Sequence, residues 1–557
     1  MLTAARHGTG AYLARFSLAG AWTALAWFCF ATTPSLLPRT WLYQAVVSGL
    51  SIVVGYATGV LAVALWRRLG FSTRLSPRAR RLSRQLLGAA ALVAVPTFLA
   101  LGARWQDETR EWFGMPSAGP WHGVRQLVVA LAIALTVLQV ARGQRWLTRR
   151  WAARLSRRLP LRVARLAAVL AVGAVSVALL NAGVVQRVLD TLNDTYALSD
   201  GTTPDGVEPP TVPERSGSPA SSSAWDTLGR QGRAFVGTGP DVDAIAAFTE
   251  STGRVAATRE PIRVYAGLDA AVTLESAAEL VVAELDRTDA WEREVLVVAT
   301  TTGTGWVDPS AAAAIELLHD GDTAIAAMQY SYLPSWVSFV VDRSTPPEAG
   351  GALFEAVYDA WEDRPADDRP RLVVFGLSLG SYGSQGAFAS LQDVTTRTDG
   401  ALWVGTPRFT EEWAALTAAR DPGSPEVAPV LDEGRTVRWG TTAGTAADLL
   451  DPPAEWEHPR VVYLQHPSDA VVWWSPDLAF SRPDWLREDG TGYRPPSMSW
   501  LPVVTFVQVT MDMLVAGDVP PGYGHNYRTE YAMGWAQVVP PEGWTDADTA
   551  ALIEALS

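Results

Sequence analysis

Five uncharged, apolar runs occupy most of the first 190 residues. They cover residues 16–38, 40–66, 85–103, 126–141 and 166–186. Most of them approach the roughly 20 residues that a helix needs to cross the hydrocarbon core of a bilayer. The fourth run reaches this length if it extends back through Trp121 and Val124 and Arg125 turns its guanidinium to the interface. Inside a bilayer every backbone polar group must be satisfied within the segment, so these runs predict a transmembrane domain of about five helices over residues 1–190.

Arginine is concentrated in two of the loops that connect these runs. Residues 67–84 contain seven arginines and residues 142–162 contain eight, whereas the loop after the first run contains only Arg39. Arginine-rich loops stay in the cytoplasm. The N-terminus is therefore predicted to be cytoplasmic, and five crossings place everything after about residue 190 outside the cell membrane. If the first run is instead a cleaved signal peptide, the large C-terminal part lies on the same side.

The charge of the chain is divided unevenly. The net charge is −13, but residues 1–194 carry about +18 and the remainder carries about −31. An acidic C-terminal part argues against a nucleic-acid partner, because phosphates need clustered positive charge. The single cysteine, Cys29, excludes an intrachain disulfide and a cysteine-based metal site. No run carries an internal acid–base pair of the kind found in transport pathways, so the bundle is predicted to be an anchor.

The composition changes again after the apolar runs. Residues 191–224 are predicted to be a linker, because the stretch is rich in Pro, Ser, Thr and Gly and lacks hydrophobic periodicity. Strand-like and helix-like segments alternate in residues 225–557, which predicts an α/β domain with a mostly parallel sheet and helices on both faces. The predicted strands are 262–265, 295–301, 323–330, 372–375, 401–404 and 461–465.

A serine motif follows the fourth of these strands. The sequence Gly376-Leu377-Ser378-Leu379-Gly380 has the G-x-S-x-G form of a nucleophile elbow, in which a tight turn between a strand and a helix exposes one serine. The pentapeptide alone is weak evidence in a chain with 46 glycines. The strand before it and the helical segment after it favour Ser378 as a nucleophile over an ordinary glycine-rich turn.

A serine hydroxyl needs an adjacent base and an acid that orients the base. In the α/β-hydrolase order both follow the serine, and His525 in "GYGHNYR" is the histidine with a late loop of its own. Asp469 lies in the turn after the strand 460–465 and is the predicted acid. The rival acids are Asp432, Asp448 and Asp512, and His466 is interpreted as a loop residue rather than a partner of the site.

The oxyanion of an acyl-transfer reaction must be met by two preorganised donors. The backbone N–H of Leu379, the residue after the nucleophile, is predicted to be one of them. The other is expected from the loop after the strand 295–301, at Gly303 or Thr304. A dinucleotide-binding glycine loop is excluded there because Asp308 stands where the G-x-G-x-x-G pattern needs glycine. No cofactor and no catalytic metal are expected.

Several stretches are similar to one known family. They are "SGSPASSSAWDTLGRQGRAFV", "PIRVYAGL", "TGTGWVDP", "QYSYLPSW", "GLSLGS", "YLQHPSD" and "GHNY". On these motifs the chain resembles the actinobacterial α/β-hydrolase family with an N-terminal multi-span membrane domain. The resemblance implies an α/β-hydrolase fold with Ser378 as nucleophile and supports Asp469 and His525 by position. Two features depart from the general hydrolase pattern: Ala470 follows the acid, and the stretch before His525 is helix-like rather than a last strand.

The predicted function is that of a membrane-anchored, extracytoplasmic serine hydrolase or acyltransferase of the esterase/lipase type. Its expected substrate is an envelope lipid or an acylated small molecule, attacked through an acyl-Ser378 intermediate. Two alternatives are a non-catalytic lipid-binding or scaffold protein that keeps the fold, and a transporter with an accessory hydrolase domain. Six tryptophans of the C-terminal domain could line an acyl groove or fill the core. They are Trp306, Trp336, Trp473, Trp474, Trp485 and Trp500.

The segment 505–515 could be a lid over the site or a core helix.

Overall fold

The computed structural model describes residues 16–71, 75–181, 186–335, 337–338, 342–488, 495 and 498–557. The chain divides into two compact units. The N-terminal unit comprises residues 1–188 together with 476–486 and 490–515, and the C-terminal unit comprises 189–475, 487–489 and 516–557. Trp336 lies outside the described residues.

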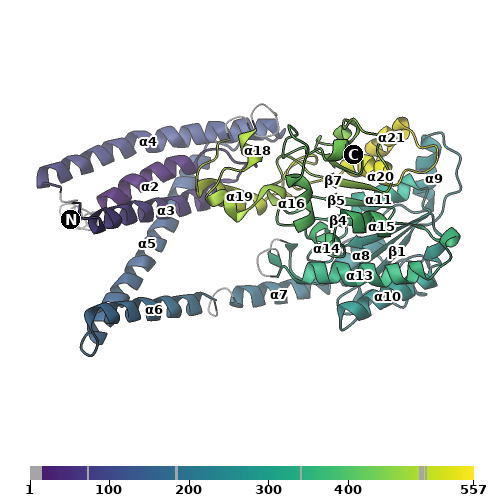
Figure 1. Ribbon diagram of the computed structural model, residues 1–557, viewed down its shortest axis with the longest axis horizontal. Helices are drawn as coiled ribbons and strands as arrows, with labels where there is room; N and C mark the ends of the chain where they lie inside the picture. Colours follow the sequence, from purple (N-terminus) through teal and green to yellow (C-terminus); the bar gives the residue numbers. More distant parts are fainter. Residues whose placement is uncertain are drawn as a thin grey trace. The chain divides into compact units, whose positions relative to one another are not determined.

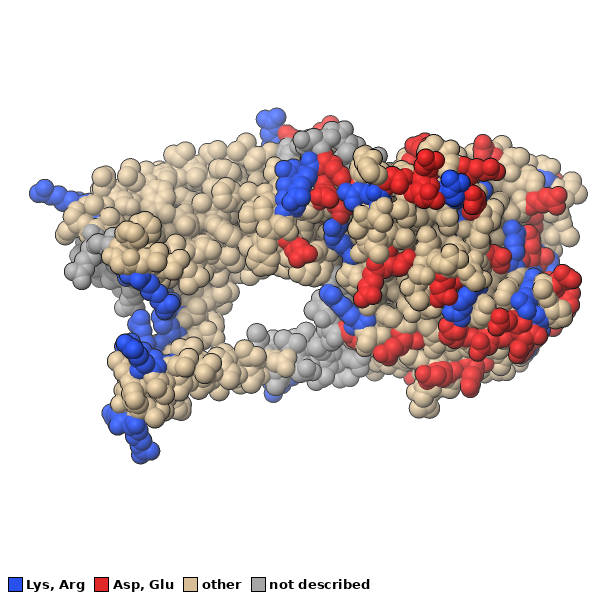
Figure 2. Space-filling model, in the orientation of Figure 1, with Lys and Arg blue, Asp and Glu red and all other residues tan. Residues whose placement is uncertain are grey.

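Long apolar helices build the N-terminal unit (Figure 1). They are α2 (Leu18–Ala31), α3 (Trp41–Arg68), α4 (Pro77–Trp112), α5 (His122–Leu155) and α6 (Leu161–Leu180). In the described part of the chain, the four helices α3 to α6 are long and apolar enough to cross a membrane. This finding indicates membrane association. In Figure 2 the middle sections of these helices carry almost no charge.

The first predicted span, 16–38, is helical only over the 14 residues of α2. The helix ends where the Thr32 and Thr33 hydroxyls donate to the carbonyls of Cys29 and Phe30, and Pro34 follows. Threonine hydroxyls that bond to the preceding turn and a nearby proline both oppose continuation of a helix. The chain continues beside the start of α3, where the Gln44 side chain donates to the carbonyl of Ala31. Among the described residues α3 to α6 are long and α2 is shorter, so the number of helices that cross a membrane stays a prediction.

Residues 476–486 and 490–515 belong to the N-terminal unit although they follow the predicted acid Asp469 in sequence. They contain η7 (Pro476–Ala479), α18 (Asp484–Arg487) and α19 (Val504–Met513). Helix α19 contacts α2 and α3. Its Asp512 is fully buried, accepts hydrogen bonds from the backbone N–H groups of Leu36 and Leu37, and forms an ion pair with Arg39 at 3.8 Å.

The C-terminal unit is built on a seven-stranded, wholly parallel sheet of order β1-β3-β2-β4-β5-β7-β6. Its strands are β1 (Ile262–Ala266), β2 (Val295–Thr300), β3 (Thr323–Met328), β4 (Arg371–Leu377), β5 (Gly400–Val404), β6 (Val437–Gly440) and β7 (Arg460–Leu464). Every residue of the seven strands is buried except the first residue of β4 and the first residue of β7. Continuous apolar strands are expected where helices cover both faces of a parallel sheet. The six predicted strands are present, and β6 is an additional edge strand.

Helices cover both faces of this sheet. Helices α10 (Leu274–Arg287), α13 (Thr345–Glu362) and α14 (Leu379–Gln385) pack next to one another on one face. The other face is covered by α8 (Gly229–Gly237), α9 (Val242–Ser251), α11 (Pro309–Leu318), α20 (Glu530–Val538) and α21 (Asp546–Leu556), whose apolar residues share one core with the strands. The shorter helices α15 (Leu391–Arg397), α16 (Glu411–Ala418) and α17 (Ala470–Trp473) lie at strand ends.

Most of the predicted linker is an ordered part of the C-terminal unit. Its first residues lie in α7 (Gln186–Asp200). The rest is irregular but packed: buried Arg215 forms an ion pair with Glu260 at 2.8 Å and donates to three main-chain carbonyls. Ser216 N–H donates to the carbonyl of Arg263 in β1. The polar residues of this segment therefore fasten it to the edge of the sheet.

Asp308 caps the N-terminus of α11, and its carboxyl group makes the stability of the folded protein depend on pH. Its carboxylate accepts from the N–H groups of Ser310 and Ala311 and from the Tyr531 hydroxyl, yet burial raises its pKa from 3.8 to about 6. Between these two values the folded protein binds more protons than the unfolded chain, so this group makes the protein less stable as the pH rises from 4 to 6. We expect Asp308→Asn, which keeps an acceptor for the cap, to stabilise the protein at pH 8 by up to about 3 kcal/mol.

This expectation is tested by following unfolding between pH 4 and pH 8 for the wild type and the Asn variant. The two stabilities should converge at pH 4, where the wild-type carboxyl is protonated. Parallel curves over the whole range would contradict the assignment.

Candidate active site

Ser378 stands at the turn between β4 and α14. Its backbone has φ 58° and ψ −122°, a left-handed conformation that a non-glycine residue adopts only when its surroundings impose it. A Cβ on Gly376 would overlap the backbone of Gly380, and a Cβ on Gly380 would overlap the carbonyl of Thr300. Both glycines of the motif are thus needed for the chain to close this turn. The strained turn leaves Ser378 at the end of the sheet with 7% of its surface exposed.

His525 and Asp469 form a pair at the same end of the sheet. The distance from His525 Nδ1 to Asp469 Oδ2 is 2.6 Å. Asp469 follows β7, caps the short helix α17 and is fully buried, and its Oδ1 accepts from the N–H of Val471 at 2.8 Å. Because the carboxylate holds Nδ1, the histidine keeps its other nitrogen, Nε2, as the acceptor. Nε2 is buried and has no hydrogen-bond partner among the described residues.

The end of β5 joins the serine to this pair. The N–H of Ser378 donates to the carbonyl of Val404 at 2.8 Å. The next residue, Gly405, has φ 54°, and a Cβ there would overlap the ring of His525 and come within 3.2 Å of Asp469 Oδ2. The structure therefore brings the three predicted residues to one place, on either side of the Val404–Gly405 peptide.

A second layer of contacts holds the loop of His525. The Tyr527 hydroxyl donates to Asp469 Oδ2 at 2.8 Å, and buried His466 lies between the carbonyl of Gly524 and the carboxylate of Glu530, both at 2.9 Å. Burial alone would raise the pKa of Glu530, but its hydrogen bond to His466 and the charge of that ring hold the pKa below its usual value. Both ring nitrogens of His466 thus contact acceptors, and the ring connects the turn at Gly524 to Glu530 at the start of α20.

His466 is therefore more than the loop residue that the sequence suggested. Both it and Tyr527 support the turn that carries His525, and neither role was predicted. The motif "GHNY" contains Tyr527, but the sequence does not show that its hydroxyl returns to the acid. The two glycines that flank the turn, Gly522 at φ 85° and Gly524 at φ 55°, allow the tight loop that the sequence predicted.

The predicted oxyanion donors lie at two backbone turns. Leu379 is the first residue of α14, where backbone N–H groups point away from the helix. Gly303 follows β2, and its N–H donates to Ser335 Oγ at 3.3 Å, while the carbonyl of Thr304 accepts from Gln329. An oxyanion that used the Gly303 N–H would displace Ser335.

The rival acids lie elsewhere. Asp512 is paired with Arg39 in the N-terminal unit, Asp448 accepts from Thr441 and Thr442, and Asp432 contacts Arg435 at 3.3 Å. None of these three bonds to His525.

The helix near 505–515 and most of the tryptophans have structural contacts. Residues 505–513 are part of α19, which is packed in the N-terminal unit. Trp473 is fully buried and donates to the carbonyl of His466, Trp485 is buried, and Trp500 donates to the carbonyl of Leu478. These contacts favour the core-packing interpretation for the three tryptophans.

The route into His525 also differs from the usual hydrolase pattern in the way that the sequence indicated. The strand at the edge of the sheet beside β7 is β6, which comes before Asp469 in the chain. The chain then enters the loop of His525 from α19. The helix-like stretch before His525 is confirmed as a helix.

A parallel sheet with covering helices and a strained serine turn after a central strand define an α/β-hydrolase fold. Comparison with protein families agrees with this: residues 262–552 match the alpha/beta-hydrolase family, and residues 32–240 match the N-terminal region of the alpha/beta-hydrolase family. The chain belongs to this family, and its membership supports a hydrolase-type function. A comparison with curated proteins found no match.

Proposed function

We propose that this protein is a membrane-anchored serine hydrolase. In this proposal the C-terminal unit is catalytic and lies outside the cytoplasm. Ser378 attacks the carbonyl of an ester, His525 takes the hydroxyl proton at Nε2, and Asp469 stabilises the imidazolium that results. The tetrahedral oxyanion is held by the N–H of Leu379 and by a donor at Gly303 or Thr304. The leaving alcohol takes the proton from His525, and an acyl-Ser378 intermediate remains.

The second half of the reaction releases the acyl group. Water, or the hydroxyl of an acceptor, loses its proton to His525 Nε2 and attacks the acyl carbonyl, and Ser378 recovers its proton as it leaves. With water the net reaction is hydrolysis, and with an acceptor it is acyl transfer. The expected substrates are envelope lipids or acylated small molecules, which a membrane-anchored enzyme meets at the bilayer surface.

One observation carries this proposal: His525 Nε2 is buried and without a partner while Nδ1 is fixed on a buried carboxylate. A buried nitrogen without a partner costs free energy unless another role uses it. The general base of a serine hydrolase holds Nδ1 on the acid and keeps Nε2 available to accept the proton of the serine, and the contacts of His525 are compatible with that role. The placement outside the cytoplasm is supported by the arginine-rich loops.

The nucleophile is tested with a fluorophosphonate probe on the full-length protein in membranes. We expect the wild type to be labelled and Ser378→Ala to lose the label. Ser381→Ala is the matched control: Ser381 lies three residues further on in α14 with its hydroxyl 2.6 Å from Thr406 Oγ1, and its loss should leave the label in place. Full labelling of Ser378→Ala would refute the assignment, because another nucleophile would then carry the label. A wild type without label would favour a scaffold that keeps the fold.

A further inference from the structure

One end of the N-terminal helix bundle has an arginine cluster without internal counter-ions. Residues 16–106 contain no Asp or Glu, and neither do residues 112–189. The three acids of α4, at 107, 108 and 111, follow Arg80 by at least 27 positions, about 40 Å along a helix. Arg80, Arg84 and Arg145 form no ion pair with any described residue. Their charge must be balanced from outside the protein.

These arginines line a cavity between four helices. The cavity has a volume of about 670 Å³ and is bordered by the start of α2, the second half of α3, the start of α4 and the middle of α5. Arg67, Arg80, Arg84 and Arg145 reach it from three different helices. A hydrogen bond of 3.2 Å from Trp22 Nε1 to Ser83 Oγ ties α2 to α4 beside it.

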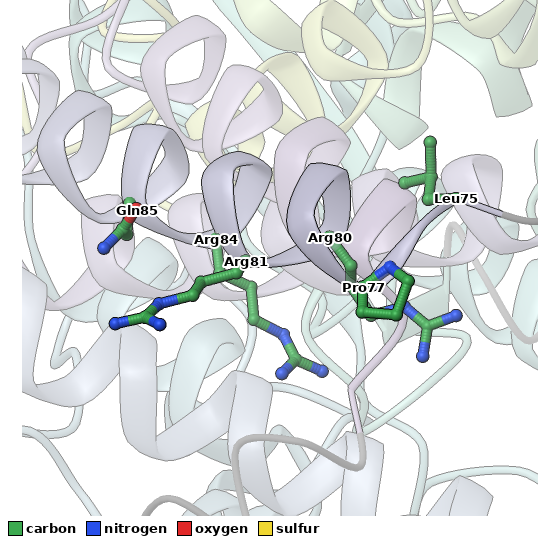
Figure 3. Close-up of a pocket in the computed structure, with 6 residues that line it drawn as sticks. All are labelled: Leu75, Pro77, Arg80, Arg81, Arg84 and Gln85. Atoms are coloured by element: carbon green, nitrogen blue, oxygen red, sulfur yellow. The ribbon is translucent and has the colours of Figure 1, made fainter.

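The opposite wall of the cavity is apolar. It is formed by Leu18, Trp22, Val60, Val63 and Ala64. On α3 this wall adjoins an exposed apolar surface, where the side chains of Leu61 and Leu65 are exposed by 66% and 60%. A second hollow of about 560 Å³ shares Leu75, Arg80 and Arg84 with the first and adds Arg81. Figure 3 shows Arg80, Arg81 and Arg84 extending from α4 toward the same side.

The combination of arginines and an apolar wall selects a class of ligand. Guanidinium groups bind phosphate oxygens through paired, charge-assisted hydrogen bonds. The volume is within the range of small-molecule sites, and basic pockets between membrane helices bind anionic headgroups. A free phosphate ion would leave the apolar wall without a partner. We propose that this cavity binds an anionic phospholipid, with its phosphate among Arg80, Arg84 and Arg145 and an acyl chain along α2 and α3.

The test uses the full-length protein in a zwitterionic detergent and titrates it with dioleoylphosphatidylglycerol, dioleoylphosphatidylcholine or inorganic phosphate. Binding is followed by native mass spectrometry and by thermal unfolding. We expect phosphatidylglycerol to remain bound and to raise the unfolding temperature, with little effect of phosphatidylcholine. Protection by inorganic phosphate equal to that by the lipid would overturn the proposal.

Two matched triple variants make the result specific. Arg80→Gln/Arg84→Gln/Arg145→Gln should weaken phosphatidylglycerol binding at least about tenfold, since each arginine near a lipid headgroup contributes about 1 kcal/mol. Arg149→Gln/Arg157→Gln/Arg158→Gln removes the same charge from residues that do not line the cavity and should bind as the wild type does. Equal weakening in both variants would show a general attraction to the membrane surface and refute a site.

Discussion

Asp469→Asn is expected to lower kcat by about 10³- to 10⁴-fold, although it changes a single atom of a residue that need not touch the substrate. The N–H of Val471 donates to Oδ1, so the amide oxygen of the new asparagine will stay there. The amide NH₂ then faces His525 Nδ1, where the carboxylate now accepts at 2.6 Å. Two donors cannot share this contact, and the imidazole must carry its proton on Nε2. A histidine in that tautomer cannot accept the proton of Ser378.

The measurement is the rate of fluorophosphonate labelling and of turnover of a short-chain aryl ester as a function of pH. Tyr527→Phe is the graded comparison, because it removes one of the hydrogen bonds to the same carboxylate and leaves the tautomer of His525 unchanged. We expect a loss of tenfold or less for that variant. If Asp469→Asn retained the wild-type rate, the Asp469–His525 pair would be structural and the proposed mechanism would be wrong.

Asp512→Ala is expected to destabilise the N-terminal unit by about 3–5 kcal/mol, since it leaves the fully buried Arg39 without its ion-pair partner. It also removes the acceptor of the N–H groups of Leu36 and Leu37. Burial raises the pKa of Asp512 to about 6 in spite of the charge of Arg39. Removal of the carboxylate leaves the charge of Arg39 buried and uncompensated, which is costly.

The readouts are thermal unfolding in detergent and proteolysis of residues 476–515. We expect the unfolding temperature to fall by roughly 10 °C for a unit of this size. Labelling of Ser378 should slow as well: the segment from Val515 leads directly to Ala516, whose carbonyl accepts from the N–H of His525 at 2.7 Å. The double variant Arg39→Met/Asp512→Leu removes both charges and should recover most of the stability. An unchanged unfolding temperature in Asp512→Ala would show that the ion pair has no part in holding the segment.

The sequence predicted most of the C-terminal unit because local signals agree with the fold there. The six predicted strands are short, mostly apolar runs between turn residues, with Arg263 inside β1, and each lies within one or two residues of its predicted bounds. Strand β6 has only four residues and no such signal. The linker was predicted from its polar composition, and its order rests on Arg215 and Ser216, whose partners are 20 to 50 residues away.

The same distinction applies to the site. Ser378, Asp469 and His525 could be proposed from motif order, and the structure brings them together. Gly405, Tyr527 and His466 could not, because their roles depend on contacts across 58 to 120 residues of chain. The length of α2 was missed for a local reason, since Thr32, Thr33 and Pro34 end a helix inside an apolar run.

The segment 476–515 also imposes an order of events during synthesis. Leu36 and Asp512, which share a hydrogen bond, are 476 residues apart in the chain. At 5–20 residues per second a ribosome needs roughly half a minute to a minute and a half to make the stretch between them. Helices α2 to α6 are made long before α19, which packs on α2 and α3, and through that interval Arg39 lacks its ion-pair partner Asp512. The N-terminal unit is thus complete only after residue 515 has been translated.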